Sequence, residues 1–264
     1  MKCKEIIQFI TDWLRNYLEE SKAKGFVVGV SGGIDSAVAS ALAARTGLPL
    51  LCVEMPIYQS QVQVSRAQNH IMLLKENYPN VRSHAVELTT VFDVFIKSLP
   101  EAEDTGKKEI SLVNVRARLR MTTLYYFSGL YDYLVVGTGN KVEDFGIGFF
   151  TKYGDGGVDL SPIADLTKSQ VYKLGDELGI IESIMTAAPT DGLWTDNRTD
   201  EDQIGARYPE LEWAMDFSGN ESALSLSKRQ REVLRIYRSL RNFNLHKIVP
   251  VPVCKIPADL VNPD

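Results

Sequence analysis

Apolar residues follow two alternating spacings along the first half of this chain. Between residues 6 and 18 they recur every three or four positions, which predicts an amphipathic helix. Residues 26–30 form a short run rich in valine, which predicts a buried parallel strand. The helical spacing returns from Ala37 to Ala43. The chain is therefore expected to open with a helix, a strand and a second helix.

The same alternation continues to about residue 136. Further strands are predicted at Leu50–Met55, Val81–Val86 and Tyr133–Val136, and further helices at about 62–74, 88–99 and 110–128. The charged, turn-rich segment 100–108 is expected to be a loop. Alternating strands and helices predict an α/β fold with a doubly wound, Rossmann-like parallel sheet flanked by helices. Ligands of such sheets bind at the carboxyl ends of the strands.

The last hundred residues predict helices and loops. Thr167 and Ser227 each begin a capping-box pattern, with a glutamine three residues later, ahead of an apolar-periodic helix. Segment 189–197 predicts a long loop, and the apolar, proline-containing segment 248–253 is expected to be extended and packed on the surface. No linker divides the chain. We therefore expect one domain over 1–264, with an α/β core at about 20–180 and a helical and loop part at about 181–264.

Composition narrows the class of protein. Of the 264 residues, 44% are hydrophobic and 24% are charged, which is typical of a globular protein. No apolar run approaches the length of a membrane span, and the start of the chain lacks the apolar core of a signal peptide. The net charge of −5 disfavours a general nucleic-acid binder. Three cysteines without a CxxC spacing favour a reducing, cytoplasmic location.

The segment 31–36 reads Ser-Gly-Gly-Ile-Asp-Ser and lies between a predicted strand and a predicted helix. Backbone N–H groups at such a turn point outward, and the helix dipole favours an anion. Adjacent glycines let the backbone approach a phosphate closely. The acid Asp35 fits a phosphate site if Mg²⁺ lies between the two. The alternative is a turn whose glycines serve packing alone.

This segment resembles the SGGxDS signature of the N-type ATP pyrophosphatases. Their adenine nucleotide alpha hydrolase-like fold binds ATP at such a loop and cleaves it between the α and β phosphates. The Walker pattern of other ATP-binding proteins is absent. A dinucleotide fingerprint begins at Gly137 and Gly139, but Val142 occupies its last position. The superfamily includes NAD, GMP and asparagine synthetases and tRNA-modifying enzymes.

Several further motifs, in order along most of the chain, resemble those of the NAD synthetases. Residues 114–121, Asn-Val-Arg-Ala-Arg-Leu-Arg-Met, are similar to the family's NxxARxRM helix. Residues 137–143, residues 148–159 with their Phe-Thr-Lys-Tyr-Gly-Asp-Gly sequence, residues 188–190 and the pair His246-Lys247 complete the resemblance. It covers the chain from the glycine-rich loop to the tail, so the chain is identified as similar to the ammonia-dependent NAD synthetases.

The resemblance implies a ligase that joins deamido-NAD and ammonia at the expense of ATP, with Mg²⁺ as cofactor, in the last step of NAD biosynthesis. The nicotinate carboxylate attacks the α-phosphate and releases pyrophosphate. Ammonia then attacks the adenylated intermediate and gives NAD and AMP. Because two anions must meet, such a site needs cations and N–H donors. A homodimer is also implied, with the helix at 110–128 and the first and last helices as its candidate surface.

The resemblance also implies roles for single residues. The positions that match the family's ATP site are Gly29, Val30, Ser31, Gly32, Gly33, Ile34, Asp35, Ser36, Thr138, Lys168 and Thr190. Asp35 and Lys168 are the implied catalytic residues, and Asp35 and Glu143 are the implied Mg²⁺ ligands. The positions that match the deamido-NAD site are Arg118, Lys152, Asp159, His246 and Lys247. Phe149 and Phe150 are candidates for stacking on the nicotinate ring.

Taken alone, these residues allow plainer interpretations. The arginines of segment 116–120 fit an ordinary basic helix face, Glu143 fits a solvated acid, and segment 152–159 fits a turn. His246 fits a surface histidine. Lys168 differs, because a lysine in the first turn of a capped helix faces an unfavourable dipole. That position favours a functional role for Lys168.

The chain departs from the family pattern in two places. Many members carry Gly-Thr-Asp-His where residues 137–140 read Gly-Thr-Gly-Asn, the form typical of archaeal enzymes and of glutamine-dependent ones. The interval from Glu143 to Lys152 is one residue longer than the family pattern. The chain has no room for the glutaminase domain of the glutamine-dependent relatives, and its cysteines lack a nucleophile context. Free ammonia is therefore the expected nitrogen donor.

Two other functions stay open on the sequence. Another ATP pyrophosphatase, acting on GMP or tRNA, shares segment 31–36, but segments 114–120 and 150–156 argue against it, and the acidic net charge argues against tRNA. A non-catalytic ATP sensor needs the same loop but not Glu143, Lys152, Asp159 or Lys168. The full polar set therefore favours an amidating enzyme with small-molecule substrates over a sensor.

Overall fold

A computed structural model describes residues 1–264 apart from 102, 191–197, 220–225 and 262–264. Its centre is a parallel sheet with strand order β3-β2-β1-β4. The strands are β1 Gly25–Gly29, β2 Leu50–Glu54, β3 Val81–Ala85 and β4 Tyr133–Val136. The chain moves outward from β1 to β3 and then returns to the other side of β1, so strand order reverses between β1 and β4. The predicted doubly wound α/β fold is confirmed.

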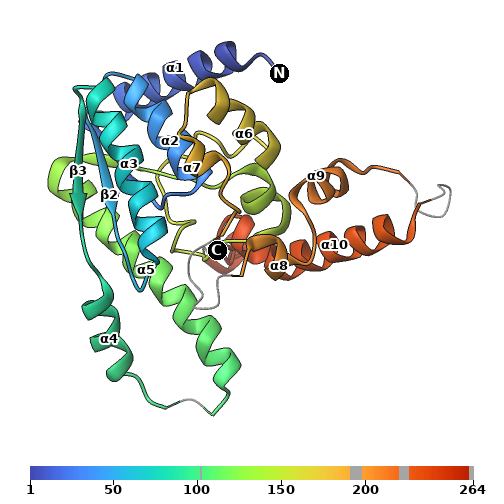
Figure 1. The fold of residues 1–264 in the computed structure, drawn as a ribbon. Helices are drawn as coiled ribbons and strands as arrows, with labels where there is room; N and C mark the ends of the chain where they lie inside the picture. Colours follow the sequence, from blue (N-terminus) through green and yellow to red (C-terminus); the bar gives the residue numbers. More distant parts are fainter. Residues whose placement is uncertain (102, 191–197, 220–225, 262–264) are drawn as a thin grey trace.

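Helices surround this sheet, as Figure 1 shows. Those before and between the strands are α1 Cys3–Ser21, α2 Ile34–Arg45, α3 Gln61–Asn77, α4 Thr89–Lys97 and α5 Thr105–Tyr131. Those after β4 are the π-helix η1 Val142–Ile147, then α6 Lys168–Glu177, α7 Glu182–Met185, α8 Asp200–Ile204, α9 Tyr208–Asp216, α10 Lys228–Ile248 and α11 Ala258–Val261. None of the described helices is long and apolar enough to cross a membrane.

Alternate strand residues bury two separate hydrophobic layers. Phe26, Val28 and Cys52 face the layer that also contains residues of α1, α2, α3 and α6. Val27 and Val53 face the opposite layer, which is closed by α4 and α5. This two-sided burial explains why the strands are nearly continuous apolar runs rather than alternating ones. It also fixes the loops at the carboxyl ends of β1 and β4 against rigid elements.

A third hydrophobic cluster lies beyond the sheet. It is formed by η1, α8, α9 and α10, with Ile147, Leu211 and Leu234 fully buried at its centre. Figure 1 shows α9 and α10 side by side, extending away from the sheet. The cluster matters for the site because η1 belongs both to this helical part and to the edge of the sheet. That the whole chain is one domain stays a prediction.

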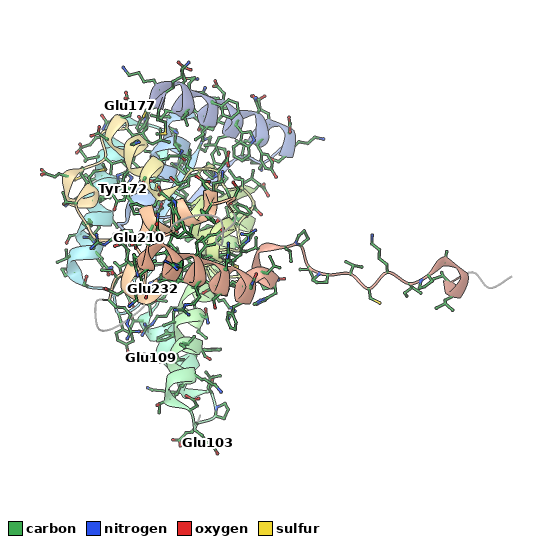
Figure 2. All side chains as sticks on the ribbon, turned by 90° about the vertical axis from the view of Figure 1, so that its right-hand side faces the viewer. Glu103, Glu109, Tyr172, Glu177, Glu210 and Glu232 are labelled. Carbon is green, nitrogen blue, oxygen red and sulfur yellow. The ribbon has the colours of Figure 1, made fainter. Side chains whose placement is uncertain are left out.

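Two expectations about local structure are wrong. Segment 100–108 is only partly a loop, since α5 already begins at Thr105 after Asp104, whose carboxylate accepts the N–H of Lys107 at 3.0 Å. The tail after α10 is extended but does not pack on this chain. Val251 and Val253 are 60% and 77% exposed, and Figure 2 shows the tail running away from the rest of the molecule.

The predicted long loop at 189–197 falls mainly on residues 191–197, which lie outside the described residues. Both predicted capping boxes are confirmed, at Thr167 for α6 and at Ser227 for α10. Cys52 is buried, as expected for a small apolar side chain. His70 is buried on α3, where its Nε2 lies 2.9 Å from Ser40 Oγ on α2, so it links these two helices.

Candidate functional site

The main cavity lies where the strand order reverses, at the carboxyl ends of β1, β2 and β4. Its volume is about 260 Å³. Gly29, Met55 and Thr138, which end or follow these three strands, line it, and α5 forms a further wall. Such a switch point is where α/β sheets bind their ligands. The cavity is therefore the candidate functional site.

The loop between β1 and α2 is held open by its own hydrogen bonds. Ser36 Oγ donates to the carbonyl of Gly33 at 3.0 Å and accepts the N–H of Ser31 at 3.2 Å. Gly32 has a positive φ of 84°. A Cβ on Gly32 would lie 2.6 Å from the carbonyl oxygen of Gln63 on α3. Glycine is therefore required here both for the backbone conformation and for the close approach of α3.

The ammonium of Lys168 lies between two carboxylates from different parts of the fold. Its Nζ contacts Asp35 Oδ2 and lies 3.1 Å from Glu143 Oε1. The Lys168 side chain is 4% exposed, and those of Asp35 and Glu143 are 17% and 15% exposed. Burial by itself lowers the pKa of Lys168, but the charges of Asp35 and Glu143 outweigh it and raise that pKa above its ordinary value. Lys168 is therefore a charged lysine.

Local sequence explains how these side chains meet. Asp35 is in the first turn of α2, where an acid is favoured by the helix dipole. Lys168 is the first residue of α6, placed by the capping box of Thr167. Glu143 is in the first turn of η1 and accepts the hydroxyl of Tyr208 at 2.5 Å. The lysine tolerates its unfavourable helix position because two carboxylates surround it.

The π-helix η1 gives a physical account of the unusual spacing in this region. A π-helix holds one residue more than an α-helical turn and is often found at functional sites. η1 spans 142–147, at the start of the interval from Glu143 to Lys152 that the resemblance predicts to be one residue longer than the family pattern. We infer that η1 accommodates the extra residue. Glu143 reaches the Lys168 ammonium from within this helix.

Two neighbouring residues fix the loop after β4. The Asn140 amide donates to Asp35 Oδ1 at 3.3 Å, while its oxygen accepts the N–H groups of Val142 and Glu143. A Cβ on residue 139 would overlap the carboxylate of Asp144, so the glycine there leaves room for that side chain. The Gly-Thr-Gly-Asn form of this loop thus fits together with an acid at position 144.

Asp35 and Glu143 have the chemistry that Mg²⁺ prefers. Both supply carboxylate oxygens, both already bind a cationic group, and Glu143 Oε2 accepts no hydrogen bond from the described residues. No group of three or more histidine, cysteine or acidic side chains within the described part of the chain is placed to hold a metal. Two carboxylates suffice for Mg²⁺ when phosphates and water supply the other ligands. The residues present therefore fit the ion.

The cavity brings most of the predicted ATP residues together. Those that line it are Gly29, Val30, Ser31, Gly33, Ile34, Asp35, Ser36, Thr138, Lys168 and Thr190, and the predicted Mg²⁺ ligand Glu143 lines it as well. Gly32 does not line the cavity, because it is packed against α3. Thr190 Oγ1 donates to the carbonyl of Arg198 at 3.3 Å.

The residues predicted for deamido-NAD form a separate group on the outside of this cavity. Lys152 Nζ donates to the carbonyl of His246 at 2.6 Å, and Arg118 donates to the carbonyl of Lys152 at 3.3 Å. Lys247 Nζ donates to the carbonyl of Phe150 at 2.6 Å. These contacts tie the end of α10 to the segment after η1. Four of the five predicted residues are thus close together.

Asp159 is set apart from that group. Its carboxylate accepts the hydroxyl of Tyr125 at 2.9 Å and the backbone N–H of Val135 at 2.8 Å. It therefore supports the junction of α5 and β4. It also lines a second, open groove with Trp13, Tyr17 and Phe145. Of the two aromatic candidates for stacking, Phe149 lines the main cavity and Phe150 contacts Lys247.

Several residues of the site escaped the sequence reasoning. Tyr208 bonds Glu143 and Asp200 from α9, and no motif marked it. Arg66 and Arg120 line the cavity from α3 and α5. Arg120 was noted only as part of a basic helix face, whereas its guanidinium donates to the carbonyl of Met55 and to the Gln59 side chain, both at 3.0 Å. The 3.6-residue period of α5, which turns Arg120 toward β2, was the available signal.

Comparison with known proteins decides the family. The family model for NAD synthase matches residues 6–248. The chain belongs to the NAD synthase family. It is 35% identical over 235 residues to the NH3-dependent NAD+ synthetase of Carboxydothermus hydrogenoformans, covering 86% of this chain and 92% of that protein. The predicted family and the α/β fold are therefore both confirmed.

Two solved structures resemble this fold closely. The NMN synthetase of Francisella tularensis has a TM-score of 0.84 and 32% identity, covering 97% of this chain and 100% of that one. The NH3-dependent NAD synthetase of Campylobacter jejuni, in complex with nitrate, has a TM-score of 0.76 and 25% identity, covering 97% and 100% of the two chains. Both likenesses extend over nearly the whole molecule.

Proposed function

We propose that this member of the NAD synthase family is a ligase that uses ATP to join deamido-NAD and ammonia, forming NAD, AMP and pyrophosphate, the last step of NAD biosynthesis. One observation carries the proposal. The loop at 31–36, which contains Asp35, lines one cavity at the strand-order switch together with Glu143 and Lys168. An anion-binding loop beside a charged lysine and two carboxylates suits a reaction on a metal-bound polyphosphate.

ATP is bound with its β and γ phosphates on the loop. The N–H groups of this loop and the hydroxyls of Ser31 and Ser36 face the phosphates, and the dipole of α2 adds to their binding. Thr138 and Thr190, which both line the cavity, bond other parts of the nucleotide. Lys168, held by its two carboxylates, keeps a positive charge next to the phosphates without needing to be ordered by the ligand.

Mg²⁺ would be held by Asp35 and Glu143. Glu143 Oε2 accepts no hydrogen bond from the described residues, and each oxygen of Asp35, which binds Asn140 or Lys168, keeps a second lone pair for the ion. The ion supplies charge neutralisation on the polyphosphate while the α-phosphate is attacked. The protein groups around it maintain its ligands. Asn140 holds Asp35, Tyr208 holds Glu143, and Lys168 contacts both. Hydrogen-bonded ligands of this kind orient a metal site and limit reorganisation during the reaction.

In the first half-reaction a nicotinate carboxylate oxygen bonds to the α-phosphorus, and the bond from that phosphorus to the β-phosphate oxygen breaks. Pyrophosphate takes the electron pair of that bond. It stays in contact with the loop and with the Lys168 side of the cavity. In the second half-reaction ammonia bonds to the carbonyl carbon, AMP leaves and ammonia's extra proton is lost. The main barrier to the first half-reaction is the repulsion between the two anions. The protein lowers it by holding them together and balancing their charge.

Deamido-NAD is bound by Arg118, Lys152, Asp159, His246 and Lys247, beside the ATP cavity. Their cationic groups suit the pyrophosphate and nicotinate of this substrate. Phe149, which lines the cavity wall, is suited to stack on the nicotinate ring. His246 is exposed and Lys152 half-buried, so a second protein surface is suited to complete the site.

A homodimer supplies that second surface. Two observations support it: Tyr126 and Leu130 on α5 are 63% and 54% exposed, and the tail after α10 carries exposed valines away from its own chain. Exposed large apolar side chains in such numbers are typical of an association surface. Light scattering on a size-exclusion column gives a molecular mass of twice 29.5 kDa if this is right. A mass of 29.5 kDa at enzyme concentrations that support turnover contradicts it.

A second candidate function is the amidation of nicotinate mononucleotide to NMN. The observation in its favour is the likeness to the Francisella tularensis NMN synthetase, which is close and complete in both chains. The chemistry at the α-phosphate and the carboxylate is the same in both reactions. The two substrates differ only in the adenylyl half of the dinucleotide. The residues of the ATP cavity do not discriminate between them.

The decisive experiment is an end-point assay by mass spectrometry with ATP, Mg²⁺ and ammonium, supplied with deamido-NAD or nicotinate mononucleotide. NAD and AMP formed in equal amounts without glutamine support the leading proposal. NMN formed at a higher kcat/KM than NAD gives the second candidate precedence. If neither dinucleotide nor mononucleotide is amidated while ATP binds, the chain acts on another substrate or is an ATP sensor.

A further inference from the structure

Arg66 is a cationic side chain of the main cavity that has no protein partner among the described residues. It lies on α3 and lines the cavity next to the loop at 31–36. Its Nε is buried and has no hydrogen-bond partner in the described part of the chain. Within the described residues its guanidinium forms no hydrogen bond, ion pair or ring contact. An arginine held in this way costs free energy unless a ligand satisfies its donors.

Close packing of α3 on Gly32 places Arg66 beside the loop at 31–36. Because Gly32 has no Cβ, α3 packs directly on the loop: a Cβ there would lie 3.3 Å from Arg66 Cβ and 3.1 Å from the backbone N of Ala67. One turn further along α3, His70 Nε2 lies 2.9 Å from Ser40 Oγ on α2. The helix that carries Arg66 is therefore fixed against the helix that follows the loop.

The other cations of the cavity are already engaged by protein groups. The cationic side chains that line it, among the residues described, are Arg66, Arg120 and Lys168. Arg120 donates to Met55 and Gln59, and Lys168 bridges Asp35 and Glu143. Each of these two is held where it is by the protein. Arg66 differs because its charge and its donors are left for whatever fills the cavity.

We propose that Arg66 binds the β and γ phosphates of ATP and stays on the pyrophosphate when it leaves. The inference rests on the proposed function, in which the loop beside Arg66 holds these phosphates. A guanidinium offers two parallel N–H donors to phosphate oxygens, which makes such a contact strong and directional. When the bond between the α-phosphorus and the bridging oxygen breaks, negative charge gathers on that oxygen. Arg66 faces this charge from α3, and Lys168 lines the same cavity from α6.

The test compares the binding of two fragments of ATP by isothermal titration calorimetry. Inorganic pyrophosphate with Mg²⁺ carries the groups that Arg66 contacts, and AMP carries the rest. We expect Arg66→Gln to weaken pyrophosphate binding at least tenfold, to leave AMP binding within twofold of the wild type, and to raise the KM for ATP but not that for deamido-NAD. Arg66→Lys should recover part of the loss. Arg82→Gln, at an exposed arginine of β3, is the matched control.

Two results overturn the inference. An unchanged affinity of Arg66→Gln for pyrophosphate overturns it directly. An equal loss of affinity for AMP and for pyrophosphate also overturns it, because Arg66 would then act on the adenosine half as well. A structural role predicts a lower melting temperature for the ligand-free variant, whereas a side chain without protein partners predicts no loss. If Arg66→Gln fails to fold, Arg66→Lys carries the same comparison. A wild type that binds pyrophosphate but makes neither NAD nor NMN refutes the proposed function and leaves the Arg66 result interpretable.

Discussion

Lys168 Nζ lies 3.1 Å from Glu143 Oε1, and this lysine also contacts Asp35, so one buried ammonium joins the start of α6 to η1 and α2. The three elements come from widely separated parts of the chain. In the absence of Mg²⁺ this ammonium is the positive charge that keeps the two carboxylates together. The contact is thus both a structural link and a part of the proposed ATP site.

Removing this cation is expected to destabilise the ligand-free protein and to stop the reaction. Lys168→Gln leaves Asp35 and Glu143 close together and only slightly exposed, at a cost of about 3–5 kcal/mol by analogy with broken buried ion pairs. We expect turnover to fall at least about 100-fold, because a positive charge next to the phosphates is lost. Chemical denaturation and a steady-state assay measure the two effects.

Adding Mg²⁺ distinguishes the loss of a positive charge in Lys168→Gln from a simple loss of packing. Because the ion would replace the missing positive charge, Mg²⁺ should raise the melting temperature of Lys168→Gln more than that of the wild type. The control is Lys141→Gln, which removes an ammonium that pairs with Asp165 at 2.9 Å on the exposed surface. If Mg²⁺ raised the melting temperatures of the wild type, Lys168→Gln and Lys141→Gln by the same amount, the proposed metal ligands would be contradicted.

Asp35→Asn and Glu143→Gln test the two ligands one at a time. Each replacement keeps the shape of the side chain but removes the charge that a hard cation needs. We expect Mg²⁺-dependent turnover to fall by about 100-fold or more while the circular dichroism spectrum stays that of the wild type. Asp165→Asn, at an exposed carboxylate, should retain full activity. Substantial turnover in either ligand variant would remove that residue from the metal site.

The elements of this fold that hydrophobic spacing predicted well are those buried on both sides. The four strands were found within one residue of their observed ends, because a strand covered on both faces is a continuous apolar run. Lys168 was also found, since its place in the first turn of a capped helix conflicts with the helix dipole. A charge that conflicts with its helix dipole indicates a functional site, because groups from elsewhere in the fold, here the carboxylates of Asp35 and Glu143, must stabilise it.

Other features could not be read from spacing. The tail at 248–253 was expected to pack on the chain, because an apolar pattern indicates burial but not which surface provides it. Tyr208 reaches Glu143 through packing between α9 and η1, which no local pattern encodes. Arg66 lies on the face of α3 that meets the loop, and only the absence of a side chain at Gly32 makes that contact possible.

Gly32→Ala should damage the loop and its contact with α3 together. Alanine is strained at a φ of 84°, and its Cβ would lie 2.6 Å from the Gln63 carbonyl oxygen. We expect the KM for ATP to rise at least tenfold and the free energy of unfolding to fall by about 2 kcal/mol or more. Gly47→Ala is the control, with a φ of 74° and nothing within 4 Å of the added Cβ. A loss of stability no larger than that of the control would mean that α3 does not press on the loop.

Acid should weaken the contact between α3 and α2. Burial lowers the pKa of His70 from 6.5 to about 4, so the folded protein holds this imidazole neutral while the unfolded chain takes up a proton near pH 6.5. Stability is therefore full above pH 6.5 and is lost as the pH falls toward 4, by about 3 kcal/mol for a shift of this size. Urea denaturation between pH 4.5 and 7.5 measures this slope.

Two variants separate this titration from the acid response of other groups. His70→Gln keeps a hydrogen-bond donor near Ser40 but cannot titrate, so its free energy of unfolding should fall less steeply as the pH is lowered. The variant should be less stable than the wild type at pH 7.5, and this difference in free energy should narrow or reverse by pH 4.5. Ser40→Ala removes the partner but keeps the buried imidazole, so its slope should remain as steep as that of the wild type. A wild type and a His70→Gln variant with parallel curves would show that α3 is not held to α2 by a neutral histidine. The support of the helix that carries Arg66 would then have to come from the apolar contacts of Ala67, Ile71 and Leu74.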